Sequence, residues 1–249
     1  MRNVLAILIL ALLFVSGCAP TAPKAPPTPP PVFDFTPAST EPPNSAGVTL
    51  ALVNPSYSET NPDKSAIFAY YPFVDFQRNM GRDFEEMLIA RGFSVTGPFR
   101  SWDDMTFPDK NGCDLILRPS LDVSVDFPGL QAQEVIMLIG DNQYKVVGQV
   151  AVRGRVTLAL TESLSGEKMW SKSVDIPAAS QVANFTGERR YPAPPSGPDP
   201  NDPGLQKVLG PMMSTAYKAV MDAAWRHFDP AEIQIVKREG QIVKDKKRY

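Results

Sequence analysis

The chain is poor in histidine and cysteine and has no strong excess of charge. Its 249 residues include one histidine, His227, and two cysteines, Cys18 and Cys113. So few ligands argue against a zinc site of cysteine and histidine, and against a histidine-based catalytic triad. A net charge of −2 provides none of the basic excess that general nucleic-acid binders carry. We therefore expect no enzymatic activity, no catalytic residue, no metal, no cofactor and no nucleic-acid partner.

The apolar run at the N-terminus is too short to span a bilayer. It covers twelve residues, 4–15, whereas a spanning helix needs about 18 or more. Ser16, Gly17 and Cys18 follow, and this arrangement is typical of a signal peptide that ends in a bacterial lipobox. The sequence therefore predicts a signal peptide over residues 1–17 and an acylated Cys18 that anchors the protein in membrane lipid. An ordinary secretory signal with an incidental cysteine is the alternative.

Two further features follow from this leader. Ala19, rather than an aspartate, comes after the cysteine, which in the enteric sorting rule implies an outer-membrane destination. Acylation of Cys18 would leave Cys113 as the only free thiol. Because Cys113 directly precedes an apolar strand pattern, we expect it to be a buried small residue rather than a reactive one.

Proline is the residue type in excess, with 26 in the chain. Ten of them lie within residues 19–43, where apolar side chains are few. Such a segment favours polyproline II and cannot offset its ordering entropy by burial. Residues 18–45 are therefore predicted to form a lipidated tether. Six more prolines within residues 191–203 predict a loop inside the folded domain.

Residues 46–230 have the pattern of a single α+β domain. Apolar residues recur at helical spacing in residues 73–91, which end before Gly92, and in residues 205–228. A short helix capped by Ser101 is expected between the first strands and the later ones. We predict a mostly antiparallel sheet with helices packed on one face. The strands are expected at residues 47–53, 93–96, 115–127, 132–139, 149–161 and 168–176.

Two of these segments alternate strictly, so each should be a half-buried antiparallel strand. Pro119 interrupts the first, which predicts an edge strand or a bulge. The polar positions of the two strands carry opposite charges that could pair across the sheet. The inward residues are Leu115, Leu117, Leu121, Val123, Val125 and Phe127, and then Val150, Val152, Val156, Leu158 and Leu160; the charged outward ones include Asp122, Asp126, Arg153 and Arg155.

The C-terminal segment, residues 231–249, is basic. Its last thirteen residues carry six cations against Glu239 and Asp245, and the apolar spacing is weakly helical. One interpretation is a solvated, frayed tail. The other is an electrostatic contact with an anionic envelope surface. In that second case the binding residues are Lys237, Arg238, Lys244, Lys246, Lys247 and Arg248.

Several short motifs, in this order, resemble the HpaA-type lipoproteins of Helicobacter, the neuraminyllactose-binding hemagglutinins. The motifs are Arg91-Gly-Phe-Ser-Val-Thr96, Asp103-Asp104-Met-Thr-Phe107, Leu115-Ile-Leu-Arg-Pro119 and Thr161-Glu-Ser-Leu-Ser-Gly-Glu167, followed by the basic end. The resemblance implies an outer-membrane, surface or flagellar-sheath lipoprotein with a role in adhesion. This chain departs from the family where a Lys/Arg-rich stretch should follow the Arg-Pro pair, because residues 120–129 contain no lysine or arginine.

The sequence therefore predicts a non-catalytic outer-membrane lipoprotein, adhesin-like or structural, at the cell surface or on a flagellar sheath. Its partners would be membrane lipid and either an envelope protein or a host glycan. The alternative is a periplasmic lipoprotein that docks on an envelope machine and assembles or activates it.

Overall fold

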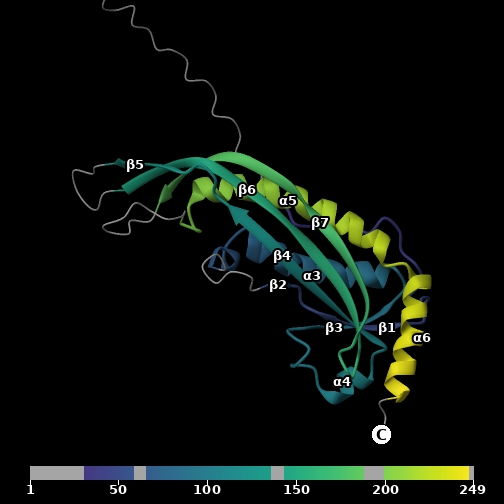
Figure 1. Ribbon diagram of the computed structural model, residues 1–249. Coiled ribbons are helices and arrows are strands. Elements are labelled where there is room, and N and C mark those ends of the chain that lie inside the picture. The colour runs from purple at the N-terminus through teal and green to yellow at the C-terminus, as the bar shows by residue number, and fades with distance from the viewer. Residues whose placement is uncertain (1–30, 59–65, 136–142, 188–198, 247–249) are drawn as a thin grey trace, which may run out of the picture. The chain divides into compact units, whose positions relative to one another are not determined.

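The computed structural model describes residues 31–58, 66–135, 143–187 and 199–246 (Figure 1). Side chains at 132–135, 143–144 and 186–187 are not described. The predicted signal peptide, Cys18, most of the second proline loop and the last three residues lie outside these ranges. The elements are β1 (Thr49–Val53), β2 (Ser56–Tyr57), η2 (Ala66–Ala69), α3 (Phe73–Ala90), β3 (Ser94–Phe99), α4 (Phe107–Asn111), β4 (Leu115–Asp126), β5 (Gln131–Val135), β6 (Gln143–Glu162), β7 (Lys168–Gly187), α5 (Pro203–His227) and α6 (Pro230–Lys246).

The described strands form one seven-stranded mixed sheet. Its order is β3-β1-β4-β6-β5, with β2 beside β4 and β7 beside β6. The long strands are antiparallel, as predicted: β4, β5 and β7 all pair with β6. The short N-terminal strands are parallel, because β1 pairs with both β3 and β4 and β2 pairs with β4. The prediction of an α+β domain is confirmed.

Pro119 lies in the interior of the sheet, so the prediction of an edge or a bulge is wrong. β4 pairs with β6 over its whole length without a shift of register, and Pro119 is opposite Leu158. On its other side, β4 pairs with β1 up to Leu117 and with β2 from Ser120. Pro119 therefore falls in the gap between two short neighbouring strands, where the ladder is interrupted.

Helices α3, α5 and α6 cover one face of the sheet (Figure 1). Every inward residue predicted for the two alternating strands is buried there except Phe127, which is partly buried. α3 ends as predicted at Gly92, whose φ of +81° and close contact with Ser45 leave no room for a side chain. The Phe93 N–H then donates to the Leu88 carbonyl oxygen (3.1 Å), which closes the last helical turn.

Part of the opposite face of the sheet is also covered. A smaller apolar cluster lies there, under β1 and the start of β4. Residues 99–113 supply its outer layer, with Met105 and Cys113 buried and Trp102 packed against them. This end of the sheet is therefore covered on both faces, while the long helices pack on one face as predicted.

The short helix predicted at Ser101 begins six residues later. The Ser101 hydroxyl accepts a hydrogen bond from the Asp104 N–H (3.2 Å), but the backbone there forms a turn rather than a helix. α4 is instead capped by Thr106. The Thr106 hydroxyl accepts from the Asp109 N–H, and the Asp109 carboxylate accepts from the Thr106 N–H (2.9 Å).

The long hairpin of β6 and β7 extends beyond the predicted strands. β7 continues past Ile176 through a bulge at Pro177 and Ala178 and remains paired with β6 as far as Gly187. β5 accounts for the first part of the strand predicted at residues 132–139, and the rest lies outside the described residues.

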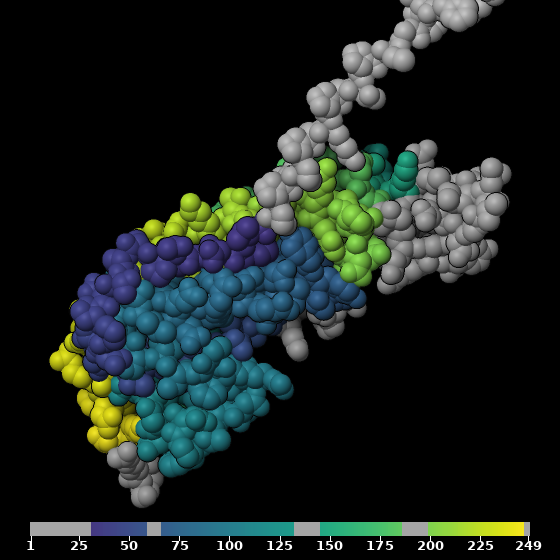
Figure 2. All heavy atoms as spheres, turned by 180° about the vertical axis from the view of Figure 1, so that it is seen from behind, coloured from purple at the N-terminus to yellow at the C-terminus, as the bar shows by residue number. Residues whose placement is uncertain are grey.

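Residues 31–46 pack into the folded unit that starts at Pro31, although the sequence analysis assigned all of them but Ala46 to the tether. We call them the strap. Phe33 and Phe35 are buried, and the Phe33 ring lies edge-on to Phe76 (6.0 Å between centroids) and Tyr217 (5.5 Å). Figure 2 shows the strap as a purple band between α3 and α5. Its two phenylalanines therefore belong to the core.

Residues 230–246 form a packed helix, α6, rather than a frayed tail. Asp229 accepts from the Ala231 N–H (2.9 Å) at the start of α6, and Ile233 and Val236 belong to the main core. Gly240 lies against Leu115, where an added Cβ would come within 3.1 Å of the leucine side chain. α6 thus covers the beginning of β4.

Candidate functional site

An open polar face lies on the side of β4, β6 and β7 away from the helices. Because neighbouring strands are in register, side chains on this face form rows across the sheet. One row consists of hydroxyls. The hydroxyl oxygens of Ser58 and Ser120 are 3.4 Å apart, and those of Thr157 and Ser173 are 3.5 Å apart. Adjacent strands are about 4.8 Å apart, so the row has a regular spacing.

Charged residues occupy the next rows of the open face. The Arg153 guanidinium lies 3.4 Å from the Asp126 carboxylate, which confirms one of the predicted cross-strand pairs. Arg155 is in register with Asp122, but its Nε donates to Asp175 on β7 (2.9 Å). The second pair therefore involves a residue that the sequence analysis had not singled out.

Arg118 is an exposed cation on this face and forms no ion pair with another described residue. It is in register with Ala159 on β6, which is in register with Ser171 on β7, so its immediate neighbours are uncharged. The open face thus combines a row of hydroxyls, two ion pairs, the exposed carboxylate of Asp122 and the guanidinium of Arg118.

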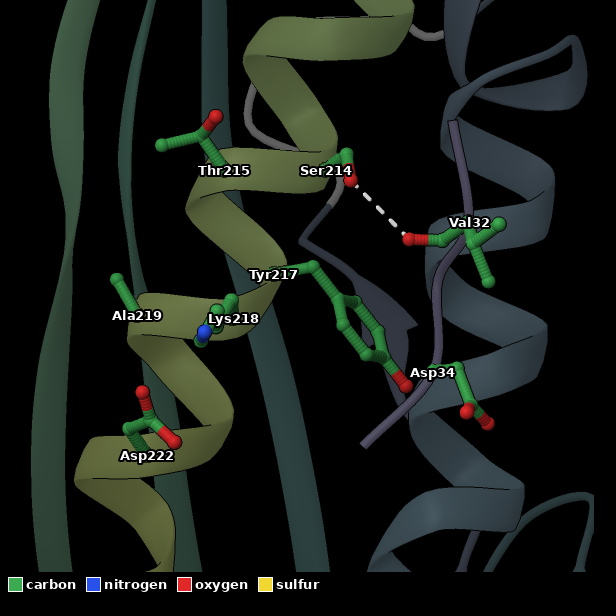
Figure 3. Close-up of a pocket in the computed structure, with 8 residues that line it drawn as sticks. All are labelled: Val32, Asp34, Ser214, Thr215, Tyr217, Lys218, Ala219 and Asp222. Atoms are coloured by element: carbon green, nitrogen blue, oxygen red, sulfur yellow. Dashed lines mark hydrogen bonds between the residues drawn. The ribbon is translucent and has the colours of Figure 1, made fainter. Parts of the chain in front are cut away.

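Apart from the open face, a hollow lies between the strap and α5 (Figure 3). It has a volume of about 440 Å³ and is bordered by Val32 and Asp34 on one side and by α5 on the other. The Ser214 hydroxyl donates to the Val32 carbonyl oxygen (3.1 Å), and Tyr217 extends from α5 toward the strap. Sequence reasoning missed this hollow because it treated the strap as tether; the pair Phe33 and Phe35 was the available signal.

Beneath this hollow, Asp83 is fully buried and held by two donors. The Tyr217 hydroxyl donates to it (2.6 Å), and the Arg82 guanidinium lies 2.8 Å away and also reaches Asp34 of the strap (3.1 Å). Burial and the hydrogen bond to Asp83 raise the pKa of Tyr217. The network joins the strap to α3 and α5.

The predicted C-terminal cations are only partly available to a ligand. Lys237 donates to the Gly47 carbonyl (2.8 Å) and lies 3.0 Å from the Asp114 carboxylate, and Lys244 is buried. Arg238 and Lys246 are exposed on α6. Lys247 and Arg248 lie outside the described residues, as does Cys18. The cations therefore do not form one continuous patch along α6.

Neither Cys113 nor His227 shows features of a reactive group. Cys113 is buried, as predicted, and burial raises its pKa to about 11, which keeps the thiol protonated. His227 lies in the last turn of α5, and burial together with Lys172 and Arg226 lowers its pKa. Among the described residues, no three histidine, cysteine, aspartate or glutamate side chains are placed to hold a metal ion. In the same ranges, no helix is both long and apolar enough to cross a membrane.

Glu162 is a buried carboxylate that braces the turn between β6 and β7. Burial alone would raise its pKa, but hydrogen bonds from the Leu164 N–H (2.9 Å), the Ser165 N–H (2.7 Å) and nearby hydroxyls hold the pKa below its ordinary value. The ionised form is therefore favoured in the folded state.

Replacing Glu162 with glutamine tests this role as a function of pH. Because the folded pKa is lowered, the stabilisation by the carboxylate is present above about pH 4.3 and is lost as the pH falls through the folded value. The free energy of unfolding in urea should thus differ between wild type and Glu162→Gln at pH 7, and the difference should shrink toward zero at lower pH. If the two proteins differed in free energy of unfolding by the same amount at pH 7 and at a pH below the folded pKa of Glu162, this role would be contradicted. The exposed Glu239→Gln variant on α6 is the control.

Comparison with known proteins identifies a solved structure with a similar fold. No family model and no curated protein matches the sequence. Among solved structures, the chain matches a neuraminyllactose-binding hemagglutinin homolog from Helicobacter pylori with a TM-score of 0.54 and 16% identity, over 84% of this chain and 97% of that one. The two proteins share a fold. The resemblance noted in the sequence is thereby confirmed at the level of structure.

Bacterial lipoproteins are also found by this comparison. Lipoprotein GNA1162 from Neisseria meningitidis is 14% identical over 52% of this chain and 79% of its own, with a TM-score of 0.26. A minor lipoprotein from Acinetobacter baumannii is 11% identical over 74% of this chain and 91% of its own, with a TM-score of 0.28.

Proposed function

We propose that this protein is a lipid-anchored, non-catalytic lipoprotein of the outer membrane that presents the open polar face to a ligand, in the manner of an adhesin. The observation that carries the ligand-binding role is the open face itself, with its row of hydroxyls and its unpaired Arg118. The lipobox before Cys18 supports the anchor, and the shared fold with the hemagglutinin homolog supports the adhesin-like role.

The chemistry of the open face suits an acidic glycan. Hydroxyl groups and paired charges exchange hydrogen bonds with sugar hydroxyls, and a free guanidinium binds a carboxylate through two parallel hydrogen bonds. The Lys/Arg-rich stretch that residues 120–129 lack is partly replaced in space, because β6 places Arg153 and Arg155 beside that strand. Because Arg153 and Arg155 are paired with Asp126 and Asp175, we expect Arg118 to bind the carboxylate of an anionic sugar.

The binding role is tested with sialyllactose, the ligand class named for the structural relative. Full-length lipoprotein in detergent should bind immobilised sialyllactose, and Arg118→Ala should weaken binding about tenfold, which corresponds to about 1.4 kcal/mol. Arg238→Ala, which removes an exposed arginine on α6, is the matched control and should bind like wild type. If Arg118→Ala and Arg238→Ala bound sialyllactose equally well, Arg118 would not be part of the ligand site.

The anchor is tested separately by mass spectrometry of protein taken from cells. The N-terminal peptide should begin at Cys18 and carry the mass of the diacylglyceryl group and the amide-linked acyl chain. Two or three acyl chains are required because one chain alone gives only marginal anchoring. An unmodified residue 18, or a different start, would refute the lipoprotein assignment.

The side of the membrane is tested by protease shaving and antibody labelling of intact cells. A surface adhesin should be cleaved and labelled without permeabilisation. Complete protection, with crosslinks to a periplasmic assembly, would support the alternative of a lipoprotein that docks on an envelope machine.

A further inference from the structure

The outer strand β7 is protected against pairing along only half of its length. β6 is its one strand partner among the described residues, so the other edge of β7 is unpaired there. Natural sheet edges are shielded by lysine, proline and bulges. The first half of β7 has all three, in Lys168, Lys172, Pro177 and the bulge after Ile176. The second half, residues 179–187, contains no charged residue and no proline.

A groove runs along the unprotected part of this edge. It has a volume of about 280 Å³, and its strand side begins at Pro177 of the bulge and continues along Ala179, Ser180 and Gln181. Consecutive residues of a strand point to opposite faces, so a hollow that residues 179, 180 and 181 all line must lie at the edge and not on one face. The next residue, Val182, has 62% of its surface exposed. The other wall comes from α5, through Pro211, Met212, Thr215 and Ala216.

The free length of this edge is short and well defined. At one end, the bulge at Pro177 interrupts the ladder. At the other end, the start of α5 lies against β7, because Gly204 is in contact with the Asn184 carbonyl group. About five residues, 179–183, therefore remain available to another strand.

We propose that this edge pairs with the same edge of a second copy of the chain, antiparallel and with a two-fold axis at Gln181. In this register Ser180 faces Val182 of the second copy, and Ala179 faces Ala183. Each residue then meets an uncharged residue, so the like-charge contacts that normally oppose self-pairing are missing. The α5 helices of the two copies approach through Pro211, Met212 and Thr215, which are also uncharged. The predicted tether is a poor occupant, because its prolines have no N–H to donate.

Pairing of this kind has a structural consequence for the whole protein. The two sheets join into one, and the two-fold axis is perpendicular to it, so both open polar faces point to the same side. A dimer would therefore present two copies of the proposed ligand face and could bind a repeated ligand bivalently. The pairing itself does not depend on the proposed function.

The proposal is tested by crosslinking in intact cells that express the full chain. Residues directly opposite in an antiparallel pair have Cβ atoms about 5 Å apart, so Gln181→Cys should form a disulfide-linked dimer under mild oxidation. Ser173→Cys, equally exposed on the protected half of β7, should not. Native Cys113 is buried and gives no background.

A second substitution in the Gln181→Cys chain tests the edge. Val182→Lys places a charged lysine on the unprotected part of the edge and should reduce the amount of disulfide-linked dimer at least tenfold. Val147→Lys, at an exposed position of β6 away from the edge, is the control and should not reduce it. Melting temperatures of the purified variants should match the parent, because neither side chain belongs to the buried core. Equal dimer yields with and without Val182→Lys, or a monomeric Gln181→Cys chain, would overturn the proposal. A crosslink to a different protein would overturn self-pairing and assign the groove to a foreign strand.

Discussion

Replacing Val156 with aspartate should unfold the protein or leave it close to unfolding. Val156 is fully buried on the inner face of β6, and in register it lies between Leu121 of β4 and Val174 of β7. None of these neighbours can donate a hydrogen bond from its side chain to a carboxylate. A buried carboxylate without a partner costs several kcal/mol, against a total stability of about 5–15 kcal/mol for a domain. We expect a loss of at least about 4 kcal/mol.

The control for this prediction is the next residue along the same strand. Thr157 points to the open polar face and lies between Ser120 and Ser173, so Thr157→Asp should cost less than about 1 kcal/mol. Urea unfolding of the two variants measures the difference. If Thr157→Asp were the more damaging substitution, the buried and open faces of the sheet would be assigned the wrong way round.

The faces of the long strands could be predicted from the sequence because the signal is local. In β4 and β6, alternate apolar residues such as Leu121 and Val156 define the inner face directly. The same holds for α3, where apolar residues at spacings of three and four precede a glycine with positive φ. These patterns need no knowledge of which segments are neighbours in space.

Strand order and the role of the strap could not be predicted because they depend on distant contacts. β1 pairs with β3 and β4, more than forty residues away in sequence, and nothing in its apolar run specifies a parallel partner. In the strap, the high proline content favoured a tether, but the burial of Phe33 and Phe35 between two helices offsets the cost of ordering it. The pair of aromatic residues was the only local sign of this packing.

The candidate site was predictable only in its charges. The sequence placed Asp122, Asp126, Arg153 and Arg155 on one face of two strands, and the structure confirms that they share it. Two members of the site, Ser173 of the hydroxyl row and the partner Asp175, lie on β7, whose register relative to β6 is set by two bulges. Bulges shift which side chains are opposite one another, and alternation alone does not reveal them.

Ending the chain after Glu232 should destabilise the protein severely. One interpretation of the sequence was a solvated, frayed tail over residues 231–249, but the structure places Ile233 and Val236 in the core. It also pairs Lys237 with Asp114. Loss of two buried aliphatic side chains and exposure of the surface beneath them should cost about 4 kcal/mol or more. For a domain of this size the melting temperature should fall by roughly 10 °C.

A chain that ends after Asp245 separates the packing of α6 from the charge of the basic end. It keeps every buried residue of the helix and lacks only Lys246 and the three residues after it. Its melting temperature should equal that of wild type within about 2 °C, since exposed ends contribute little to stability. A large decrease would mean that the last residues pack against the fold.

The same shortened chain tests whether the basic end binds anionic envelope surfaces. It loses three positive charges, Lys246, Lys247 and Arg248, and keeps the buried residues of α6. At low ionic strength it should bind vesicles containing anionic phospholipid more weakly than wild type, and the difference should disappear near 0.5 M salt, where charges are screened within a few ångströms. Arg238→Ala, which removes one exposed charge in the middle of α6, should have a smaller effect. Equal binding by wild type and the shortened chain would show that these cations serve only to keep the end of the helix solvated.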